Sequence, residues 1–251
     1  MVEEHEVFSQ PENPNQKIWR YMDFTKFVDL LNSQELYFTR PDEFEDPFEG
    51  SLSIATVRYI EAHFDGTPEQ WVEVKRQLTQ GIYRRGATLL PGVNCWHMND
   101  HESAAMWKLY LKSNEGIAIQ TSYAKLKDAL MPSPQACFLG IVKYIDYDNE
   151  IMANNNLFSP LVHKRNSFEH ESEVRAVVFI NQFLQVNGIP QTAEQLPSGL
   201  KVRVPLETLV ERVYVSPDSP PWLTQLVSDT CRRFGFEFDV VNSRLSELPI
   251  Y

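Results

Sequence analysis

The chain has 251 residues, and 23 Lys and Arg against 34 Asp and Glu give it a formal net charge of −11 at pH 7. This charge argues against a protein that coats nucleic acid nonspecifically, because neutralising phosphates requires clustered Lys and Arg. No segment approaches the roughly 18 consecutive apolar residues of a membrane-spanning helix. The three cysteines are scattered and form no CxxC pair, which is typical of a reduced protein. We therefore expect a cytoplasmic protein with no membrane contact and no tight nonspecific nucleic-acid binding.

The first sixteen residues are polar and carry almost no apolar pattern, so we expect a flexible arm over residues 1–16. The acidic segment over residues 42–50 contains Phe44 and Phe48, and we expect these rings to hold it as an ordered loop. The elements expected up to residue 110 are strands at 17–22, 35–40 and 92–98 and helices at 24–32, 67–85 and 102–110.

The rest of the chain continues to alternate between short strands and helices. The segment 182–200 is polar and is expected to be a long connection. The elements expected there are strands at 116–121, 138–147, 173–180, 212–215 and 236–241, helices at 123–130 and 221–234, and a short helical stretch near residue 164. The predicted fold class is α+β, a single domain over residues 17–251 with a central mixed β-sheet of about seven to eight strands flanked by helices.

The pattern with the clearest chemistry is Glu171-Ser-Glu173 at the start of the strand at 173–180, followed by Arg175. Alternate residues of a strand share a face, so these three charged side chains are expected to project together. Two neighbouring carboxylates tend to raise the pKa of one of them, which suits a group that takes up or releases protons. Glu171 and Glu173 are therefore the candidate catalytic residues. The pattern also fits a structural ion-pair network, and the sequence leaves both interpretations open.

Candidate ligand-binding residues lie elsewhere along the chain. Arg20 can clamp a phosphate or carboxylate, and Tyr21 can stack on a flat ring. Trp107 and Tyr110 are three residues apart on a helix, so they share a face on which a base or a nicotinamide can stack. Arg40, which precedes the acidic segment, completes the set. For each residue the alternative is a purely structural role, as an edge Arg or as part of an aromatic core.

His97 and His101 lie four residues apart, with Glu102 beside the second. This spacing resembles a zinc-binding helix, but an Asn-Asp turn interrupts it and no third ligand is evident, so no metal is expected. Cys95 on an apolar strand is interpreted as a buried small side chain rather than a thiol nucleophile. The phosphate-binding loop, the dinucleotide fingerprint and the nucleophile elbow do not occur in the sequence.

Asp-Pro-Phe-Glu at 46–49 and Glu-x-Glu-x-Arg at 171–175 are specific motifs, and with the other pieces they resemble the bacterial domain-of-unknown-function 2971 family. The similarity extends over residues 17–246. The other resembling pieces are Trp19-Arg-Tyr21, Leu36-Tyr-Phe, Phe44-Glu, Gly50, Cys95-Trp96, Glu102-Ser103, Met106-Trp107, Tyr110, Gly116-Ile-Ala-Ile, Lys164, Val213-Tyr-Val-Ser-Pro217 and Ser243.

A second, weaker resemblance concerns mechanism. Arg20, Thr121-Ser122 and Glu171-Ser-Glu173 occur in the order in which ADP-ribosyltransferases carry an Arg or His, a Ser-Thr-Ser or Tyr motif and a catalytic Glu. The middle motif departs from that pattern, because it is Gln-Thr-Ser. The resemblance implies that Arg20 holds the ribose or phosphate of NAD and that Ser122 positions the active-site strand. It further implies that Glu173 stabilises an oxocarbenium-like transition state and that Glu171 activates the acceptor.

Three hypotheses about function follow. The first is an NAD-consuming ADP-ribosyltransferase or NAD glycohydrolase with a toxin or defence role, with NAD as the substrate and a protein or nucleic acid as the acceptor. The second is a noncatalytic module that binds a small-molecule or nucleotide ligand or a partner, for which the acidic segment and the many aromatics are the motivation. The third is a metal-dependent hydrolase built on His97, His101 and Glu102. Convergence of Arg20 and Glu173 with Ser122 in one pocket would favour the first hypothesis.

Overall fold

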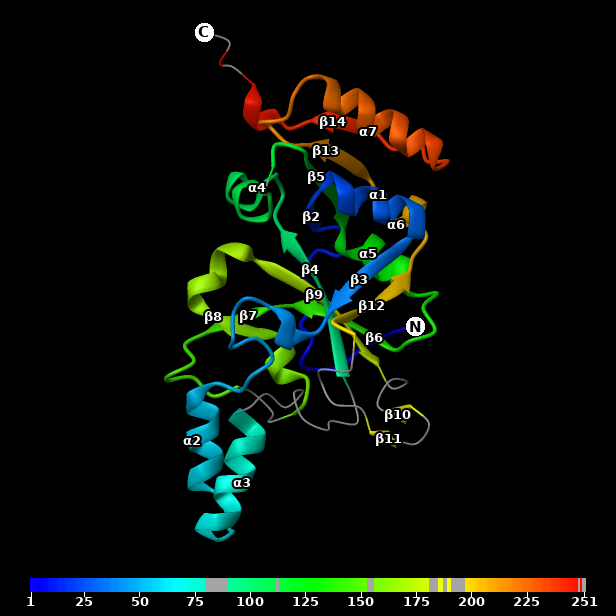
Figure 1. Cartoon of the computed structure of the whole chain (residues 1–251). Coiled ribbons are helices and arrows are strands. Elements are labelled where there is room, and N and C mark those ends of the chain that lie inside the picture. Colours follow the sequence, from blue (N-terminus) through cyan, green and yellow to red (C-terminus); the bar gives the residue numbers. More distant parts are fainter. Residues whose placement is uncertain are drawn as a thin grey trace.

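A mixed β-sheet forms the centre of the structure, a computed structural model (Figure 1). The structure describes residues 1–79, 90–111, 113–152, 156–180, 185–186, 189–190, 197–247 and 249. Within these residues the main sheet has ten strands, eight of them in the order β1-β6-β9-β4-β2-β5-β13-β14, while β3 pairs with β4 and β12. Their bounds are β1 Val2–Glu3, β2 Lys17–Asp23, β3 Glu35–Thr39, β4 Leu90–Met98, β5 Gly116–Ser122, β6 Cys137–Ile141, β9 Glu173–Ile180, β12 Gly199–Arg203, β13 Arg212–Val215 and β14 Val240–Asn242.

Helices flank this sheet, which confirms the predicted α+β class with a single large mixed sheet. Two further strand pairs lie outside it, β7 Lys143–Ile145 with β8 His163–Arg165, and β10 Gln185–Val186 with β11 Ile189–Pro190. The helices are α1 Phe24–Ser33, α2 Ile54–Ala62, α3 Pro68–Thr79, α4 Ala104–Tyr110, α5 Tyr123–Leu130, α6 Leu206–Leu209 and α7 Trp222–Arg233. No helix of the described residues is long and apolar enough to cross a membrane.

One face of the sheet carries the largest hydrophobic core. Alternate residues of each strand point to this face, for example Ile117 and Ile119 of β5 and Val174 of β9. Helices α1, α5, α6 and α7 cover the face (Figure 1), and each contributes buried side chains to the same cluster. Helix α1 begins where the side chain of Asp23 accepts a hydrogen bond from the backbone of Lys26, as the sequence predicts.

The opposite face is covered by shorter pieces. Helix α4 packs Met106 and Trp107 against Trp19 and Tyr21 of β2. The β7–β8 pair and the acidic segment 42–50 lie further along the same face (Figure 1). Polar side chains lie between α4, the β7–β8 pair and the acidic segment, and the candidate carboxylates are among them.

The N-terminal arm was expected to be flexible, but residues 1–16 pack against the protein. Strand β1 pairs in parallel with β6, and the terminal amine of Met1 donates a hydrogen bond to the carbonyl of Ser133 at 2.5 Å. Val7 and Phe8 are buried in a cluster with Phe138. The arm is mostly polar, so its sequence gives little weight to these two apolar residues. Their burial, together with the pairing of β1 with β6, holds the arm against the protein.

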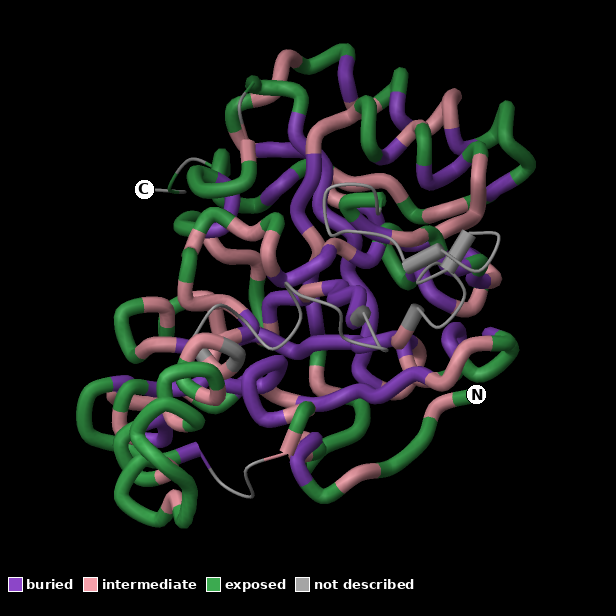
Figure 2. The backbone as a smooth tube through the Cα atoms, turned by 60° about the horizontal axis from the view of Figure 1, so that its bottom comes forward, coloured by how far each residue is buried: buried purple, intermediate pink, exposed green. Residues whose placement is uncertain are grey.

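Helices α2 and α3 form a hairpin that extends away from the sheet (Figure 1). Their surface is mostly exposed in Figure 2, whereas the strands of the sheet are buried along most of their length. A small cluster of Leu52, Val57, Tyr147 and Met152 anchors the hairpin. The sequence predicts that α3 continues to residue 85, and residues 80–89 lie outside the described part of the chain.

Several expected elements differ from the observed ones. The stretch around Lys164 is strand β8 between two 3₁₀ turns rather than a helix. The expected strand at 138–147 is split into β6 and β7, and the end of the expected connection at 182–200 forms β12, paired with β3. Helix α7 ends before Gly235, whose positive φ of 88° fits the predicted glycine stop.

Candidate functional site

Three adjacent strands carry the charged residues that the sequence singles out. Strand β4 lies between β9 and β2, and it pairs antiparallel with both. Glu173, His97 and Trp19 are therefore neighbours in one row across the sheet. Arg20 follows Trp19 on β2, so the candidate arginine and the candidate glutamate are separated by a single strand.

The edge of β4 that faces β2 is interrupted. Strand β4 pairs with β2 near its end and with β3 near its start, which leaves residues 94–96 without a strand partner on this edge in the described chain. We call this interval the ladder break. Two side chains occupy it: the amide of Asn94 donates to a carbonyl of β3 at 2.8 Å, and the Nη1 of Arg20 donates to the carbonyl of Cys95 at 2.9 Å.

Among the residues that the structure describes, Arg20 has no carboxylate partner. Its guanidinium lies 5.8 Å from the centre of the Trp96 ring, and within the described residues it forms no ion pair and no second hydrogen bond. Burial lowers the pKa of Arg20, although no protein side chain removes its charge at neutral pH. Its other N–H groups form no hydrogen bond within the described residues, and the protein does not fully enclose them. A half-buried arginine with unused donors is suited to bind a phosphate or a carboxylate.

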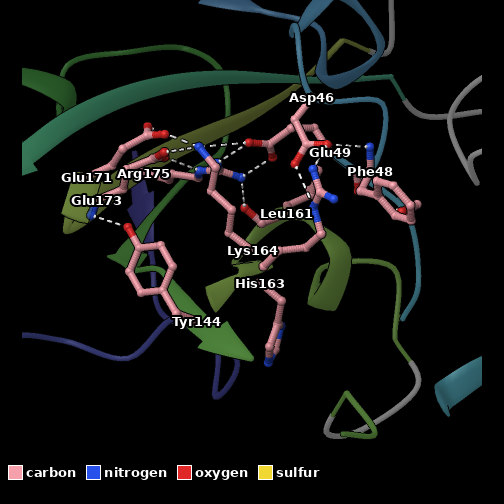
Figure 3. Close-up of polar contacts among 12 residues, drawn as sticks. Asp46, Phe48, Glu49, Tyr144, Leu161, His163, Lys164, Glu171, Glu173 and Arg175 are labelled. Atoms are coloured by element: carbon pink, nitrogen blue, oxygen red, sulfur yellow. Dashed lines mark hydrogen bonds and ion pairs between the residues drawn. The ribbon is translucent and has the colours of Figure 1, made fainter. Parts of the chain in front are cut away.

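On the other side of β4 five charged side chains form a cluster (Figure 3). Glu49 accepts hydrogen bonds from both terminal nitrogens of Arg175, each at 2.9 Å. Glu173 accepts from Nε of Arg175 at 2.6 Å and from Nζ of Lys164 at 2.7 Å. Lys164 also lies 3.0 Å from Glu171 and 3.2 Å from Glu49. We call these five residues the Glu–Lys–Arg cluster.

The cluster joins three segments that are distant in sequence. Glu49 comes from the acidic segment, Lys164 from β8, and Glu173 with Arg175 from one face of β9. Removing one partner from such a buried network leaves an uncompensated charge, which is strongly destabilising. The acidic segment is therefore an ordered loop, as predicted, but its Glu49 contributes to the interior of the protein rather than to its surface charge.

The two candidate carboxylates differ in protonation. Burial alone would raise the pKa of Glu173, but Arg175 and Lys164 lower it well below the usual range. Burial first, and then the hydrogen bond and charge of Glu173, raise the pKa of Glu171 to about 7. The cluster has three carboxylates and two cations, so a proton on Glu171 balances its charge. Glu171 is therefore the carboxyl that gains and loses a proton near neutral pH.

Glu171 also has the more open position. Its side chain is 13% exposed, whereas that of Glu173 is 4% exposed. The two carboxylates meet because Ser172 between them adopts a left-handed conformation with φ of 41°, and not because both belong to a strand. The carbonyl of Glu171 lies 2.6 Å from Nδ1 of His97, which fixes the end of the 3₁₀ turn against β4.

Tyr110 lies near both the ladder break and Glu171. Its ring is exposed, but burial of the hydroxyl end, followed by the charges of Cys95, Glu171 and Glu173, raises the pKa of Tyr110. Arg20 is affected electrostatically by the same tyrosine and by Cys95. Burial likewise raises the pKa of the Cys95 thiol, so this cysteine is not a thiolate nucleophile. The Tyr110 hydroxyl is thus neutral at physiological pH.

Ser122 does not belong to this site. Its hydroxyl caps α5 by accepting a hydrogen bond from the backbone of Lys125 at 3.3 Å. Strand β5 is three strands from β9, or roughly 14 Å at about 4.8 Å per strand. Arg20, Ser122 and Glu173 therefore do not converge in one pocket. The strand between Arg20 and Glu173 is β4, which carries Cys95 and His97.

Two aromatic candidates are part of the core. Tyr21 and Trp107 are buried, with ring centres 4.9 Å apart in an edge-to-face contact. The hydroxyl of Tyr21 accepts a hydrogen bond from the backbone of Ser103, and the indole of Trp107 donates to Glu102. These side chains hold α4 against β2 and offer no surface on which a ligand can stack. Of the expected stacking pair, only Tyr110 is exposed.

Arg40 and the two candidate histidines do not lie at the ladder break as ligand-binding groups. Arg40 forms two hydrogen bonds with the carboxylate of Asp42, at 2.6 and 2.9 Å, within the acidic segment. His101 is exposed near the surface end of α4, while His97 contacts Glu171. In the part of the chain that the structure describes, no three His, Cys, Asp or Glu side chains are grouped to hold a metal ion.

Sequence reasoning missed the contribution of Glu49 and Lys164 to the cluster. A signal for Glu49 was its place directly after Phe48, at the end of the Asp-Pro-Phe-Glu motif at 46–49. Lys164 belonged to the resemblance, but no local pattern gave it a chemical role, because that role depends on the pairing of β8 with β7. Comparison with known proteins adds no assignment, since no family model and no curated protein matches the chain.

Proposed function

We propose that the protein consumes NAD, as an ADP-ribosyltransferase or NAD glycohydrolase, at the ladder break. The observation that carries the proposal is that a cation without a carboxylate partner among the described residues, Arg20, and a titratable carboxyl, Glu171, belong to residues that both hydrogen-bond to β4, through Cys95 and His97. Arg20 has unused donors for the diphosphate, and Glu171 has a pKa of about 7. The proposal includes a toxin or defence role in the cytoplasm, with which three free cysteines are consistent.

The reaction assigns a distinct task to each group. The bond between C1′ of the nicotinamide ribose and the pyridinium nitrogen breaks, and its electron pair leaves with neutral nicotinamide. An acceptor hydroxyl or water forms the new bond to C1′, and its proton passes to the carboxylate of Glu171. In this proposal Tyr110 donates a hydrogen bond to the substrate from its neutral hydroxyl. Because only ionised Glu171 accepts the proton, the rate should rise with pH through about 7.

Glu173 is a positioning residue in this proposal. Its carboxylate is already paired with Lys164 and Arg175, and it is almost fully buried. It therefore sets the pKa and orientation of Glu171 and does not contact NAD. This differs from the role that the resemblance implied for Glu173, because the hydrogen bonds of the cluster leave that carboxylate no free side.

The test is release of nicotinamide from NAD by the purified full chain. Glu171→Gln and Arg20→Lys should each reduce the rate by at least about 100-fold, the scale of a lost acid–base or electrostatic contact. Glu207→Gln and Arg203→Lys are matched controls, since both residues are exposed on other elements, and they should leave the rate unchanged. No release by the native protein, or equal loss in controls and site variants, would refute the proposal.

A noncatalytic binding module is the second candidate, and the saturated state of Glu173 favours it. Such a module would use Arg20 to bind an anionic ligand and the Glu–Lys–Arg cluster only for stability. It predicts that ADP-ribose binds, that Arg20→Lys weakens this binding, and that no nicotinamide is released at any pH. Calorimetry with ADP-ribose beside the NAD assay separates the two candidates.

A further inference from the structure

A pocket of about 480 Å³ lies on the same face of the sheet as α4 but away from the ladder break. The row of neighbouring residues that begins at Glu173 and His97 continues through Trp19 to Gln120 and Arg212. These last three residues line the pocket, so Trp19 separates it from the proposed NAD site. We call it the Gln120 pocket.

Gln120 is the unusual residue of this pocket. It is only 6% exposed, and its side-chain amide forms no hydrogen bond with any described residue. Its amide atoms are not enclosed by protein, so they are directed into the pocket. A buried amide normally forms hydrogen bonds, because leaving its donors and acceptor unused costs free energy. An unused donor and acceptor on one planar group match the edge of a nucleobase, which presents the same pair.

Aromatic side chains form the wall beside this amide. The ring of Tyr214 lies 4.9 Å from that of Trp19 and is half-buried, which leaves part of its surface to the pocket. A base that pairs with Gln120 would therefore contact an aromatic ring, an arrangement by which proteins hold nucleobases. The volume is in the range of pockets that hold small molecules.

The charges around the pocket limit the ligand further. Arg212 pairs with Asp239 and Arg244 with Glu247, while the carboxylate of Glu102 accepts three hydrogen bonds. Lys17 has no carboxylate partner among the described residues and is exposed at the rim. The lining cations Lys17, Arg212 and Arg244 are balanced by Asp100, Glu102 and Glu247. Lys17 is therefore the lining cation that remains free to bind an anion, and the other lining charges cancel. Such a pocket suits one phosphate group rather than a polyphosphate.

We infer that the Gln120 pocket binds a nucleoside monophosphate, with the base on Gln120 and Tyr214 and the phosphate near Lys17. This inference does not depend on NAD consumption, because its residues are separate from Arg20 and Glu171. It gives the protein a second site for a nucleotide ligand, beyond the one at the ladder break.

Calorimetric titration of the full chain with AMP, GMP, CMP and UMP tests the inference. At least one should bind, and Gln120→Leu should raise its Kd at least about tenfold, equal to 1.4 kcal/mol. Lys17→Ala changes an exposed residue and leaves the core intact. It should raise the Kd of the monophosphate about fivefold and leave the Kd of the free nucleoside unchanged. Ribose 5-phosphate, which lacks the base, should bind no better than inorganic phosphate.

Two results would overturn the inference. One is the absence of binding by all four monophosphates at millimolar concentration. The other is binding that Arg20→Lys abolishes and Gln120→Leu leaves unchanged, because the nucleotide would then occupy the ladder break. Thermal unfolding of Gln120→Leu checks that it is folded, and Lys17→Ala provides the decisive comparison if it is not.

Discussion

The pKa of Glu171 makes the stability of the folded protein depend on pH in an uncommon direction. Burial and Glu173 raise this pKa from 4.5 to about 7, so between these values the folded state holds a proton that the unfolded state has lost. The free energy of unfolding should therefore fall as the pH rises through this window. At about 1.4 kcal/mol per pKa unit, the rise corresponds to about 3 kcal/mol at pH 8.

Glu171→Gln removes this effect without removing a hydrogen-bonding side chain. Glutamine resembles the protonated carboxyl and leaves two carboxylates with two cations in the Glu–Lys–Arg cluster. Urea unfolding of the variant and the native protein should give similar stabilities at pH 5 and a variant more stable by up to about 3 kcal/mol at pH 8. Glu207→Gln, a control on the exposed side of α6, should show no such pH-dependent difference.

A raised pKa of Glu171 would be contradicted if Glu171→Gln destabilised the protein more at pH 8 than at pH 5. That result would mean that the ion pair with Lys164 stabilises ionised Glu171 more than burial and Glu173 destabilise it. The opposite sign of the pH dependence makes the two cases easy to separate, even if the magnitude differs.

Three further changes should alter stability in defined ways, each measured by urea unfolding at pH 7. Glu173→Gln leaves Lys164 and Arg175 short of a carboxylate and should cost about 3–5 kcal/mol; a loss below 1 kcal/mol would show that the cluster is hydrated. Phe8→Ala should cost about 3–5 kcal/mol because Phe8 is buried, whereas a flexible arm would lose nothing. Ser103→Ala removes the N-cap of α4 and should cost about 1 kcal/mol, and no change would argue against that cap.

Local structure could be predicted from the sequence where a single segment contains the signal. Strands β2, β5 and β9 follow from their apolar and β-branched residues, and α1 and α7 from their caps and glycine stop. The fold class follows from the alternation of these elements. The sheet order could not be predicted, because the pairing of β9 with β4 and of β5 with β2 depends on contacts far apart in sequence.

The candidate site was predicted only in part for the same reason. Arg20 and Glu173 lie on strands that only β4 separates. No local pattern showed that the side chain of Glu49 would pair with Arg175 and Lys164, or that these two cations would also occupy Glu173. Ser122 illustrates the opposite error, since a serine that follows a strand has the same local pattern in a motif and in a helix cap. Tyr21 and Trp107 were ambiguous because aromatic side chains serve both cores and binding sites.

The most direct test of the site at the ladder break is NMR observation of arginine Nε–H signals during titration with ADP-ribose. The Arg20 signal is assigned by its absence from Arg20→Lys. If Arg20 binds the diphosphate, this signal should shift saturably at ligand concentrations that leave the Arg203 signal unaffected. An Arg20 signal that stays in place up to millimolar ADP-ribose would contradict the proposed site, because it would show that Arg20 does not bind the diphosphate.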